Sequence, residues 1–323
     1  MKEQTEILHK PVLLNEVVNL LLSCGGTAFL DGTVGSGGYA QAILERLGTE
    51  GLVIGLDRDD AAIERTRSRL QHYVNSGRLR LYQENFERFP EVLQKEGLSQ
   101  IDGAVLDLGV STEQLMEAER GFSFMKDGPL DMRMDRRMKK TAADLVAELS
   151  EKDLADIFFR YGEERYARRI ANAIVKARKT HPIKTTGDLV NIILSVLPEK
   201  ERRSRIHPAT RVFQALRIKL NRELEALDNF LDIILDYLRP GGVLCIVSFH
   251  SLEDRMVKER FRKWARACTC PPNLPVCRCG GKSKVVILTR KAIKPSDEEI
   301  ELNPKARSAK LRAVRLLNPD CPP

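Results

Sequence analysis

Asp31, Asp57 and Asp107 each close a short run of residues that favours β structure, and they are the side chains of this sequence best placed for chemistry. A glycine-rich loop follows the first of them: Gly35-Ser36-Gly37-Gly38-Tyr39-Ala40 fits the pattern G-x-G-x-x-A between a strand and a helix. Glycines let the backbone approach a ligand closely, and a helix N-terminus favours polar or negative groups. The pattern predicts a nucleotide-type ligand rather than a purely structural turn.

The acids distinguish between two classes of such ligands. Asp57 lies 20 residues after Gly37, where a carboxylate accepts hydrogen bonds from ribose hydroxyls. Asp31 would repel the pyrophosphate of a dinucleotide, but it suits the ammonium and sulfonium charges of S-adenosylmethionine. The pattern D-G-T-x-G-x-G-G therefore favours a methyl donor over NAD. Phe86 is placed to lie against an adenine, or else it is an ordinary core aromatic.

The segment from Asp107 to Ser111 stands where amino-group methyltransferases keep the polar residues that meet the target base. It has no cysteine, which disfavours the covalent route to carbon 5 of a pyrimidine. Transfer to an exocyclic amine needs no metal and no side-chain nucleophile, but an acceptor must help to hold and deprotonate the amine. Asp107 is the leading catalytic candidate, with bracing of the loop as its structural alternative. His250 is the second candidate, and it too has a structural alternative.

The elements that must position these residues alternate between strand and helix. Strands are expected at residues 27–30, 52–56, 79–82, 104–106, 243–249, 285–288 and 313–317, and helices at 40–47 and 61–74. This alternation predicts an α/β fold with a parallel, doubly wound sheet, in which ligands bind beyond the carboxyl ends of the strands. The three aspartates and His250 should then surround one crevice.

A segment without strand signal interrupts this pattern. Three capping-box starts, at Thr141, Ser150 and Thr185, precede helical runs, and residues 163–179 predict a basic helix. The sequence thus predicts a sheet domain in two parts, residues 1–115 and 207–323, around an inserted helical substrate-recognition domain at 116–206. A long helix should run from Pro208 to Leu238, with Gln214, Arg217 and Asn221 forming a polar line on it.

Composition limits the function classes. The 323 residues are 42% hydrophobic and 30% charged, with a net charge of +8, and no apolar run is long enough to cross a bilayer. The absence of a signal-peptide pattern and an odd count of seven cysteines lead us to expect a cytoplasmic protein. Residues 116–210 carry a net charge of +5, residues 255–323 carry +11, and the remainder carries −8. The basic segments favour a polyanionic partner such as nucleic acid, or merely solvate the surface.

Four cysteines crowd into twelve residues of the C-terminal part. They form two C-x-C pairs, Cys268 with Cys270 and Cys277 with Cys279, in a proline-rich stretch. Four thiolates suit tetrahedral zinc, although C-x-x-C pairs are commoner. Zinc is thus a possible staple for a basic loop, and the chemistry above does not require it.

The chain resembles the family of bacterial 16S ribosomal RNA cytosine-N4 methyltransferases along nearly its whole length. The resemblance is carried by His9 to Leu14, Asp31 to Gly38, Asp107 to Ser111, Gly121 to Phe124, Asp127 to Asp135, His207 to Arg217, Ser248 to Arg255 and Ala306 to Arg312. It implies a class I (Rossmann-like) S-adenosylmethionine-dependent methyltransferase sheet with an inserted all-helical domain. It also implies N4-methylation of a cytidine in the decoding (P-site) region of 16S ribosomal RNA within the small ribosomal subunit.

The resemblance implies site residues as well. Family donor contacts fall on Gly37, Gly38, Tyr39, Asp57, Phe86, Asp107 and Gln114. The position of Tyr39 is often histidine in the family, and Thr112-Glu113 replaces its Ser-Pro before Gln114. Candidate substrate-binding residues are Arg133, Gln214, Arg217, Asn221 and Ser251. Neither a membrane nor DNA is an expected partner.

Two other functions remain open from the sequence. The same donor site would permit methylation of DNA or protein. A non-catalytic ribosome-binding factor could also retain the donor site as a relic of the fold, although Asp31, Asp57 and the intact glycine loop argue against it.

Overall fold

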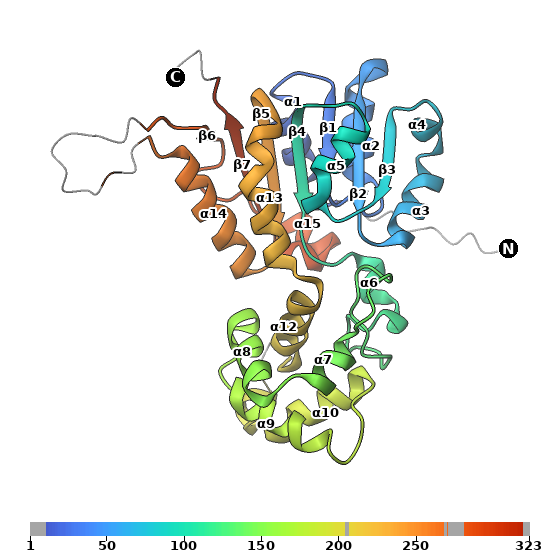
Figure 1. Cartoon of the computed structure of the whole chain (residues 1–323), viewed down its shortest axis with the longest axis vertical. Coiled ribbons are helices and arrows are strands. Elements are labelled where there is room, and N and C mark those ends of the chain that lie inside the picture. The colour runs from blue at the N-terminus through green and yellow to red at the C-terminus, as the bar shows by residue number, and fades with distance from the viewer. Residues whose placement is uncertain (1–10, 204–206, 268–269, 271–280, 319–323) are drawn as a thin grey trace. The chain divides into compact units, whose positions relative to one another are not determined.

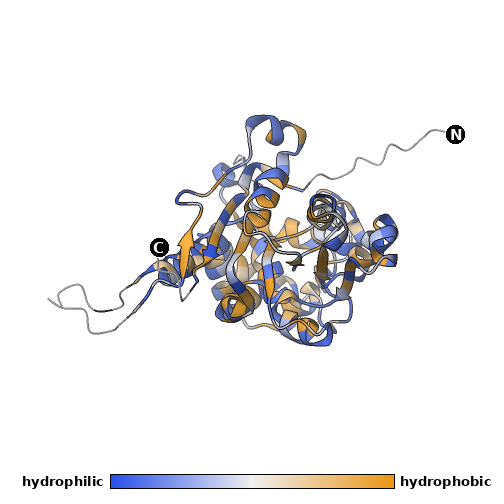
Figure 2. Ribbon diagram, turned by 90° about the horizontal axis from the view of Figure 1, so that it is seen from above, coloured by the Kyte–Doolittle hydropathy of each residue, from blue (hydrophilic) through white to orange (hydrophobic). Residues whose placement is uncertain are grey.

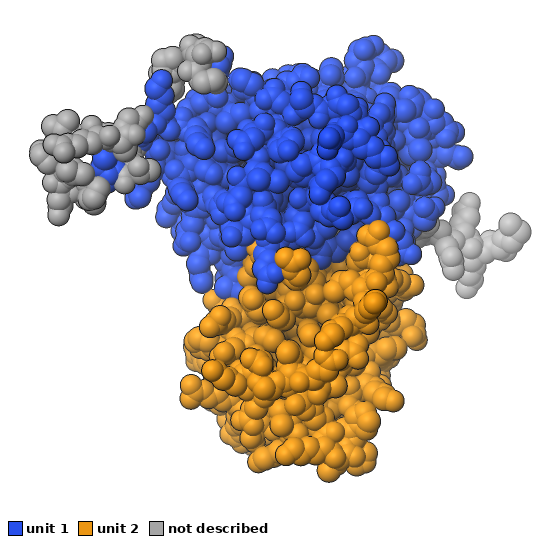
Figure 3. Space-filling view, in the orientation of Figure 1, with its two compact units in different colours: residues 1–109, 225–323 blue, residues 110–224 orange. Residues whose placement is uncertain are grey.

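The computed structural model describes residues 11–203, 207–267, 270 and 281–318. It divides into two compact units, coloured separately in Figure 3. We call residues 1–109 and 225–323 the sheet unit, and residues 110–224 the helical unit.

The sheet unit is built on seven strands, labelled in Figure 1. They are β1 (Ala28–Asp31), β2 (Leu52–Asp57), β3 (Leu79–Gln83), β4 (Ile101–Asp107), β5 (Leu238–Ser248), β6 (Val285–Ile287) and β7 (Lys310–Leu316). Their order is β3-β2-β1-β4-β5-β7-β6; the first five are parallel, and β7 runs antiparallel to both of its neighbours. The seven predicted strands and the doubly wound sheet are confirmed. The strand order reverses between β1 and β4, which is where ligands enter such sheets.

Helices cover both faces of the sheet. One face is packed by α1 (Leu14–Leu22), α2 (Gly38–Arg46), α3 (Asp60–Arg69) and α4 (Gln71–Asn75), and the other by α5 (Phe89–Lys95), α13 (Glu223–Tyr237) and α14 (Ser251–Ala265). Successive strand residues serve opposite cores: Phe29 joins the first and Leu30 the second. The strands are therefore apolar on both faces. Figure 2 colours the ribbon by hydropathy, with hydrophobic residues in orange and hydrophilic residues in blue. The unit is completed by η1 (Gly48–Glu50), η2 (Phe86–Arg88), α15 (Asp297–Leu302) and η4 (Pro304–Ser308).

The helical unit has a core of its own. Its elements are α6 (Thr112–Met116), η3 (Ala118–Arg120), α7 (Ala142–Glu148), α8 (Glu151–Gly162), α9 (Ala167–Ala177), α10 (Thr186–Val196), α11 (Glu199–Arg202) and α12 (Ala209–Asn221). Thr141, Ser150 and Thr185 cap α7, α8 and α10 as predicted, because each side chain accepts a hydrogen bond from the backbone of the third residue that follows.

The predicted helix from Pro208 to Leu238 is two helices. α12 buries Val212 and Leu216 in the core of the helical unit, whereas α13 buries Leu227 and Leu231 in the sheet unit. The chain turns between them at Arg222, whose φ of 52° cannot continue a helix. The helical unit consequently extends over 110–224, further than the predicted 116–206.

Two smaller expectations also change. The helix expected over 61–74 breaks at Leu70 into α3 and α4. The helix expected over 163–179 begins only at Ala167, because Glu163 ends α8 with a left-handed φ of 48°.

Candidate active site

Three carboxylates lie at the carboxyl edge of the sheet, on neighbouring strands. β1 lies between β2 and β4; Asp31 pairs in register with Gly55 on one side and with Val105 on the other. Asp57 and Asp107 each stand two residues beyond those partners, so they flank Asp31 at the same edge. The predicted grouping of the three acids is confirmed.

The glycine loop starts from this edge. Gly35 and Gly37 have positive φ values of 52° and 82°, and a Cβ at Gly37 would come within 2.8 Å of α3. A Cβ at Gly38 would come within 2.1 Å of Pro11, so part of the need for glycine here is close packing. The Thr66 hydroxyl donates to the Gly35 carbonyl at 2.7 Å. These contacts hold the loop in one conformation before any ligand arrives.

Asp57 joins the loop to the end of β2. One of its carboxylate oxygens accepts from the Gly35 amide at 3.0 Å, and the other from the Asp59 amide at 2.9 Å. Each carboxylate oxygen can accept more than one hydrogen bond, so Asp57 keeps acceptor capacity for a ligand. Burial raises the pKa of Asp57, and the two backbone amides oppose that rise.

Asp31 and Asp107 are held less completely. Asp31 accepts from the Thr33 amide at 3.3 Å through one oxygen, and the Ala40 amide also lowers its pKa. The other oxygen of Asp31 is buried with no partner among the described residues. Asp107 likewise has one buried oxygen without a described partner, while its backbone amide donates to the Thr33 hydroxyl at 2.6 Å. An unsatisfied buried polar atom costs about 1–3 kcal/mol. Both orphaned oxygens therefore indicate a missing ligand group.

The electrostatics of the edge point to a cation. Burial raises the pKa of Asp31 to about 7, and the nearby charge of Asp57 adds to the effect. Burial raises the pKa of Asp107 well above its usual range, helped by the charges of Asp31 and Glu253. Repulsion among buried carboxylates is relieved by a positive charge. The donor set thus fits a cationic ligand such as the sulfonium-bearing methyl donor, and it opposes a pyrophosphate.

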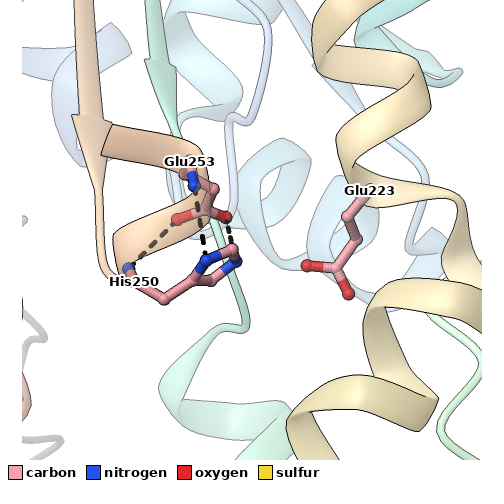
Figure 4. Close-up of side chains that lie close together, drawn as sticks. All are labelled: Glu223, His250 and Glu253. Atoms are coloured by element: carbon pink, nitrogen blue, oxygen red, sulfur yellow. Dashed lines mark hydrogen bonds and ion pairs between the residues drawn. The ribbon is translucent and has the colours of Figure 1, made fainter. Parts of the chain in front are cut away.

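His250 and Glu253 stand at the next strand end, where β5 leads into α14 (Figure 4). The His250 Nδ1 accepts from the Glu253 amide at 3.4 Å, and its Nε2 lies 3.0 Å from Oε1 of Glu253. The Oε2 of Glu253 accepts from the amides of Phe249 and His250, at 3.0 and 3.3 Å. With Nδ1 as acceptor, the neutral ring carries its proton on Nε2.

Glu253 is a site residue that the sequence reasoning missed. Glu253 is 2% exposed, and its charge raises the pKa of Asp107. It therefore belongs to the same carboxyl edge of the sheet as Asp107. The sequence did carry a signal for Glu253. In the capping-box pattern, a residue that caps the start of a helix is followed three positions later by Glu, as His250 is by Glu253. Histidine is not an ordinary member of that pattern, which is why the pair was not recognised.

Two aromatic residues of the predicted site lie in the cores. Phe86 is buried in η2 and packs edge-to-face on Phe230, with ring centroids 5.7 Å apart. The side chain of Tyr39 is buried, and its hydroxyl donates to the backbone carbonyl of Val12. Burial and the charges of Asp107 and Asp31 raise the pKa of Tyr39 well above its usual value, so it is a neutral donor.

Comparison with known proteins identifies the family. The family model described as "MraW methylase family" matches residues 6–317. The chain belongs to this family of methylases. It is 51% identical over 306 residues to "Ribosomal RNA small subunit methyltransferase H" of Syntrophobacter fumaroxidans, covering 95% of each chain. It is 48% identical over 311 residues to the protein of that name from Halothermothrix orenii, covering 96% of this chain and 99% of the relative.

Solved structures resemble it more distantly. An rRNA methylase from Streptococcus thermophilus aligns over 94% of this chain and 95% of its own length, at 11% identity and a TM-score of 0.41. As a member of the MraW methylase family, the chain is a methyltransferase, with the Rossmann-like sheet of that enzyme class.

Five of the predicted site residues lie in the helical unit and already have partners there. Gln114 shares a capping box with Ser111 at the start of α6, and Gln214 donates to the Tyr161 carbonyl at 3.3 Å. Arg133 forms an ion pair with Asp131, and Arg217 forms one with Glu223. Asn221 is hydrogen-bonded to the backbone of Met132 and Met134. Ser251 lies in the sheet unit, where it is exposed at the first position of α14.

The four-cysteine cluster can be followed only in part. Cys268, Cys277 and Cys279 lie outside the described residues, and Cys270 carries a free thiol. Zinc binding there stays a prediction. No helix among the described residues is both long and apolar enough to span a membrane.

Proposed function

We propose that this methylase transfers the methyl group of S-adenosylmethionine to N4 of a cytidine in the decoding (P-site) region of 16S ribosomal RNA, within the small ribosomal subunit. One observation carries the proposal: Asp31 and Asp107 present orphaned, buried carboxylate oxygens beside a preformed glycine loop. The relatives are named as small-subunit ribosomal RNA methyltransferases, which supports the choice of substrate.

The donor-binding role falls on the sheet edge and the loop. Asp57 would accept from the ribose hydroxyls with its spare lone pairs, and Asp31 would balance the positive charge of the amino-acid end. The backbone of Gly35, Gly37 and Gly38 would line the ligand. The Phe86 ring would lie against the adenine of the ligand. Tyr39 would act through its backbone, because its hydroxyl is committed to Val12. Gln114 is a further proposed contact to S-adenosylmethionine, which the family resemblance implies.

Asp107 is the residue that we assign to the amine. S-adenosylmethionine supplies a methyl group activated by a sulfonium, so the protein has to orient the amine and receive its proton. The unpartnered oxygen of Asp107 is a hydrogen-bond acceptor, and its raised pKa suits it to hold a proton. His250, fixed by Glu253, is the second polar group at that edge.

The substrate base must be presented unpaired, because an exocyclic amine inside a duplex cannot reach a donor. Arg133, Gln214, Arg217, Asn221 and Ser251 remain the proposed substrate-binding residues. DNA is not an expected partner. Where hydrogen bonds within the protein already engage these side chains, RNA binding would have to use their remaining hydrogen-bonding capacity.

The test is transfer of labelled methyl to small subunits, free 16S RNA and DNA in parallel, with the product base identified by mass spectrometry. We expect N4-methylcytidine in small subunits and little transfer to DNA. Asp107→Asn should lower the rate at saturating donor by a factor on the order of 10² or more. Full transfer by this variant with unchanged donor affinity would refute the role of Asp107, and a product other than N4-methylcytidine would refute the reaction.

A further inference from the structure

The last turn of α14 and the segment before β6 form a cleft in the sheet unit. The Lys284 amide donates to the Trp264 carbonyl at 2.8 Å, and the Ser283 hydroxyl donates to the Ala265 carbonyl at 2.9 Å. These bonds fasten two segments that lie about twenty residues apart in the sequence. The cleft has a volume of about 650 Å³ and is lined by Glu259, Arg262, Lys263, Ala265, Arg266 and Ile287. It is much larger than a single small anion requires.

Among the described residues, no acidic side chain pairs with the cations of this cleft. Arg262, Lys263 and Arg266 are exposed, and none of them forms an ion pair with a described residue. Lys282 and Lys284, on the neighbouring segment, are also exposed and lack such a partner. Glu259 is the acidic residue of the lining. The cleft therefore carries an excess of positive charge.

Other basic residues of the same region behave differently. Arg260, on the same helix, pairs with Asp228 and Asp232. Lys310 and Arg312 on β7 both pair with Asp254, at 3.0 and 2.6 Å. The net charge of +11 over residues 255–323 thus has a neutralised part, which supports the fold, and an unpaired part to which the cations of this cleft belong.

Helix-end electrostatics explain only some of this pattern. Cations in the last turn of a helix are stabilised by its dipole, which accounts for Arg262 and Lys263. The dipole does not explain the exposed lysines on the segment before β6. A bound polyanion explains both sets.

We propose that this cleft binds the phosphate backbone of the substrate RNA, as a contact surface of the sheet unit separate from the carboxylate edge. The proposal rests on the proposed function, since it names where part of the RNA is held. The rest of the sheet unit is acidic and repels RNA, so a local basic surface is needed to hold the strand. Contacts to phosphates position the RNA without reading its sequence.

The experiment compares the full chain with a triple variant, Arg262→Gln/Lys263→Gln/Arg266→Gln, in binding to a 16S ribosomal RNA transcript over a series of salt concentrations. Loss of three phosphate contacts should reduce the slope of log affinity against log salt by about 2 and weaken binding by roughly 10- to 100-fold. The affinity for S-adenosylmethionine and the melting temperature should not change. In methyl transfer to small subunits, KM should rise and kcat should stay.

A matched control is Arg290→Gln/Lys291→Gln/Lys294→Gln, which removes the same charge from exposed positions of the same unit outside the cleft lining. It should keep most of the wild-type affinity. A second variant, Arg262→Lys/Arg266→Lys, keeps the charges and should bind nearly as well as wild type. The inference is overturned if the control weakens binding as much as the cleft variant, or if the cleft variant keeps its affinity and salt slope. If the wild-type protein bound the RNA but transferred no methyl group, the proposed function would be wrong and the inference about the cleft would stand.

Discussion

At the carboxyl edge of the sheet, Asp31 and Asp107 each hold a buried oxygen with no partner among the described residues. In the helical unit, Asn221 is 3% exposed, but its amide accepts from the Met134 backbone and donates to the carbonyls of Met132 and Arg217. Arg120, 3% exposed, similarly donates to the carbonyls of Arg133 and Met134. The carboxyl edge and the surroundings of Asn221 thus use buried polarity in different ways.

The difference separates two roles that sequence patterns do not distinguish. A buried polar group with a full set of protein partners stabilises the fold, because removing it leaves those partners unsatisfied. A buried polar group that lacks a partner costs stability, and it is retained where a ligand supplies the partner. By this criterion the sheet edge is built for a ligand, whereas the bonds of Asn221 serve the fold and leave only its remaining hydrogen-bonding capacity for the RNA contact proposed above.

The largest expected effect is on the ligand side of this comparison. Asp57→Ala should weaken binding of S-adenosylmethionine by roughly 10²- to 10³-fold, because it removes the proposed ribose acceptor and leaves the Gly35 and Asp59 amides without theirs. Isothermal titration calorimetry would measure this loss. Asp60→Ala is the control, since Asp60 is the exposed acid three residues later and should leave the affinity unchanged. An Asp57→Ala protein that binds the donor within twofold of wild type would remove Asp57 from the site.

The next effect tests the architectural side. Asn221→Ala should lower the free energy of unfolding by about 3 kcal/mol, because the buried amide of Met134 and carbonyl of Met132 lose their partner. Urea unfolding followed by circular dichroism would measure it. Asn191→Ala, at an exposed position of α10, is the matched control and should change stability little. If the Asn221→Ala protein kept its stability but lost affinity for RNA, Asn221 would be a substrate-binding residue and not one that stabilises the fold.

The sequence predicted the sheet edge better than the helical unit, for a physical reason. Parallel strands alternating with helices have few possible arrangements, so the strand-end positions of Asp31, Asp57 and Asp107 already implied their proximity. Local capping at Thr141, Ser150 and Thr185 was equally readable, because a cap depends on residues three apart.

Long-range partners could not be read in the same way. Nothing near Asn221 in the sequence indicates its bonds to a segment almost ninety residues earlier. The break at Arg222 was missed because the apolar periodicity continues across it, although α12 and α13 serve different cores. The pairing of Arg217 with Glu223 likewise depends on that break, since the two residues would not meet on one straight helix.

The smallest expected effect is at Asp31. If Asp31 serves a ligand, replacing it should raise the free energy of unfolding of the ligand-free protein; if it stabilises the fold, replacing it should lower that free energy. The folded-state pKa of about 7 lies above the ordinary value of 3.8, so the ligand-free folded protein binds this proton more tightly than the unfolded chain does. Asp31 therefore costs stability progressively as pH rises between these values, and the full cost is present above about 7.

Asp31→Asn removes that cost, because the neutral amide oxygen can still accept from the Thr33 amide. The variant should be more stable than wild type by about 1–2 kcal/mol near pH 8 and gain much less near pH 5, as measured by urea unfolding without ligand. Its affinity for S-adenosylmethionine should fall over the same range, because the balancing negative charge is gone. A protein destabilised by Asp31→Asn at both pH values would instead place Asp31 with Asn221, among the groups that hold the fold together.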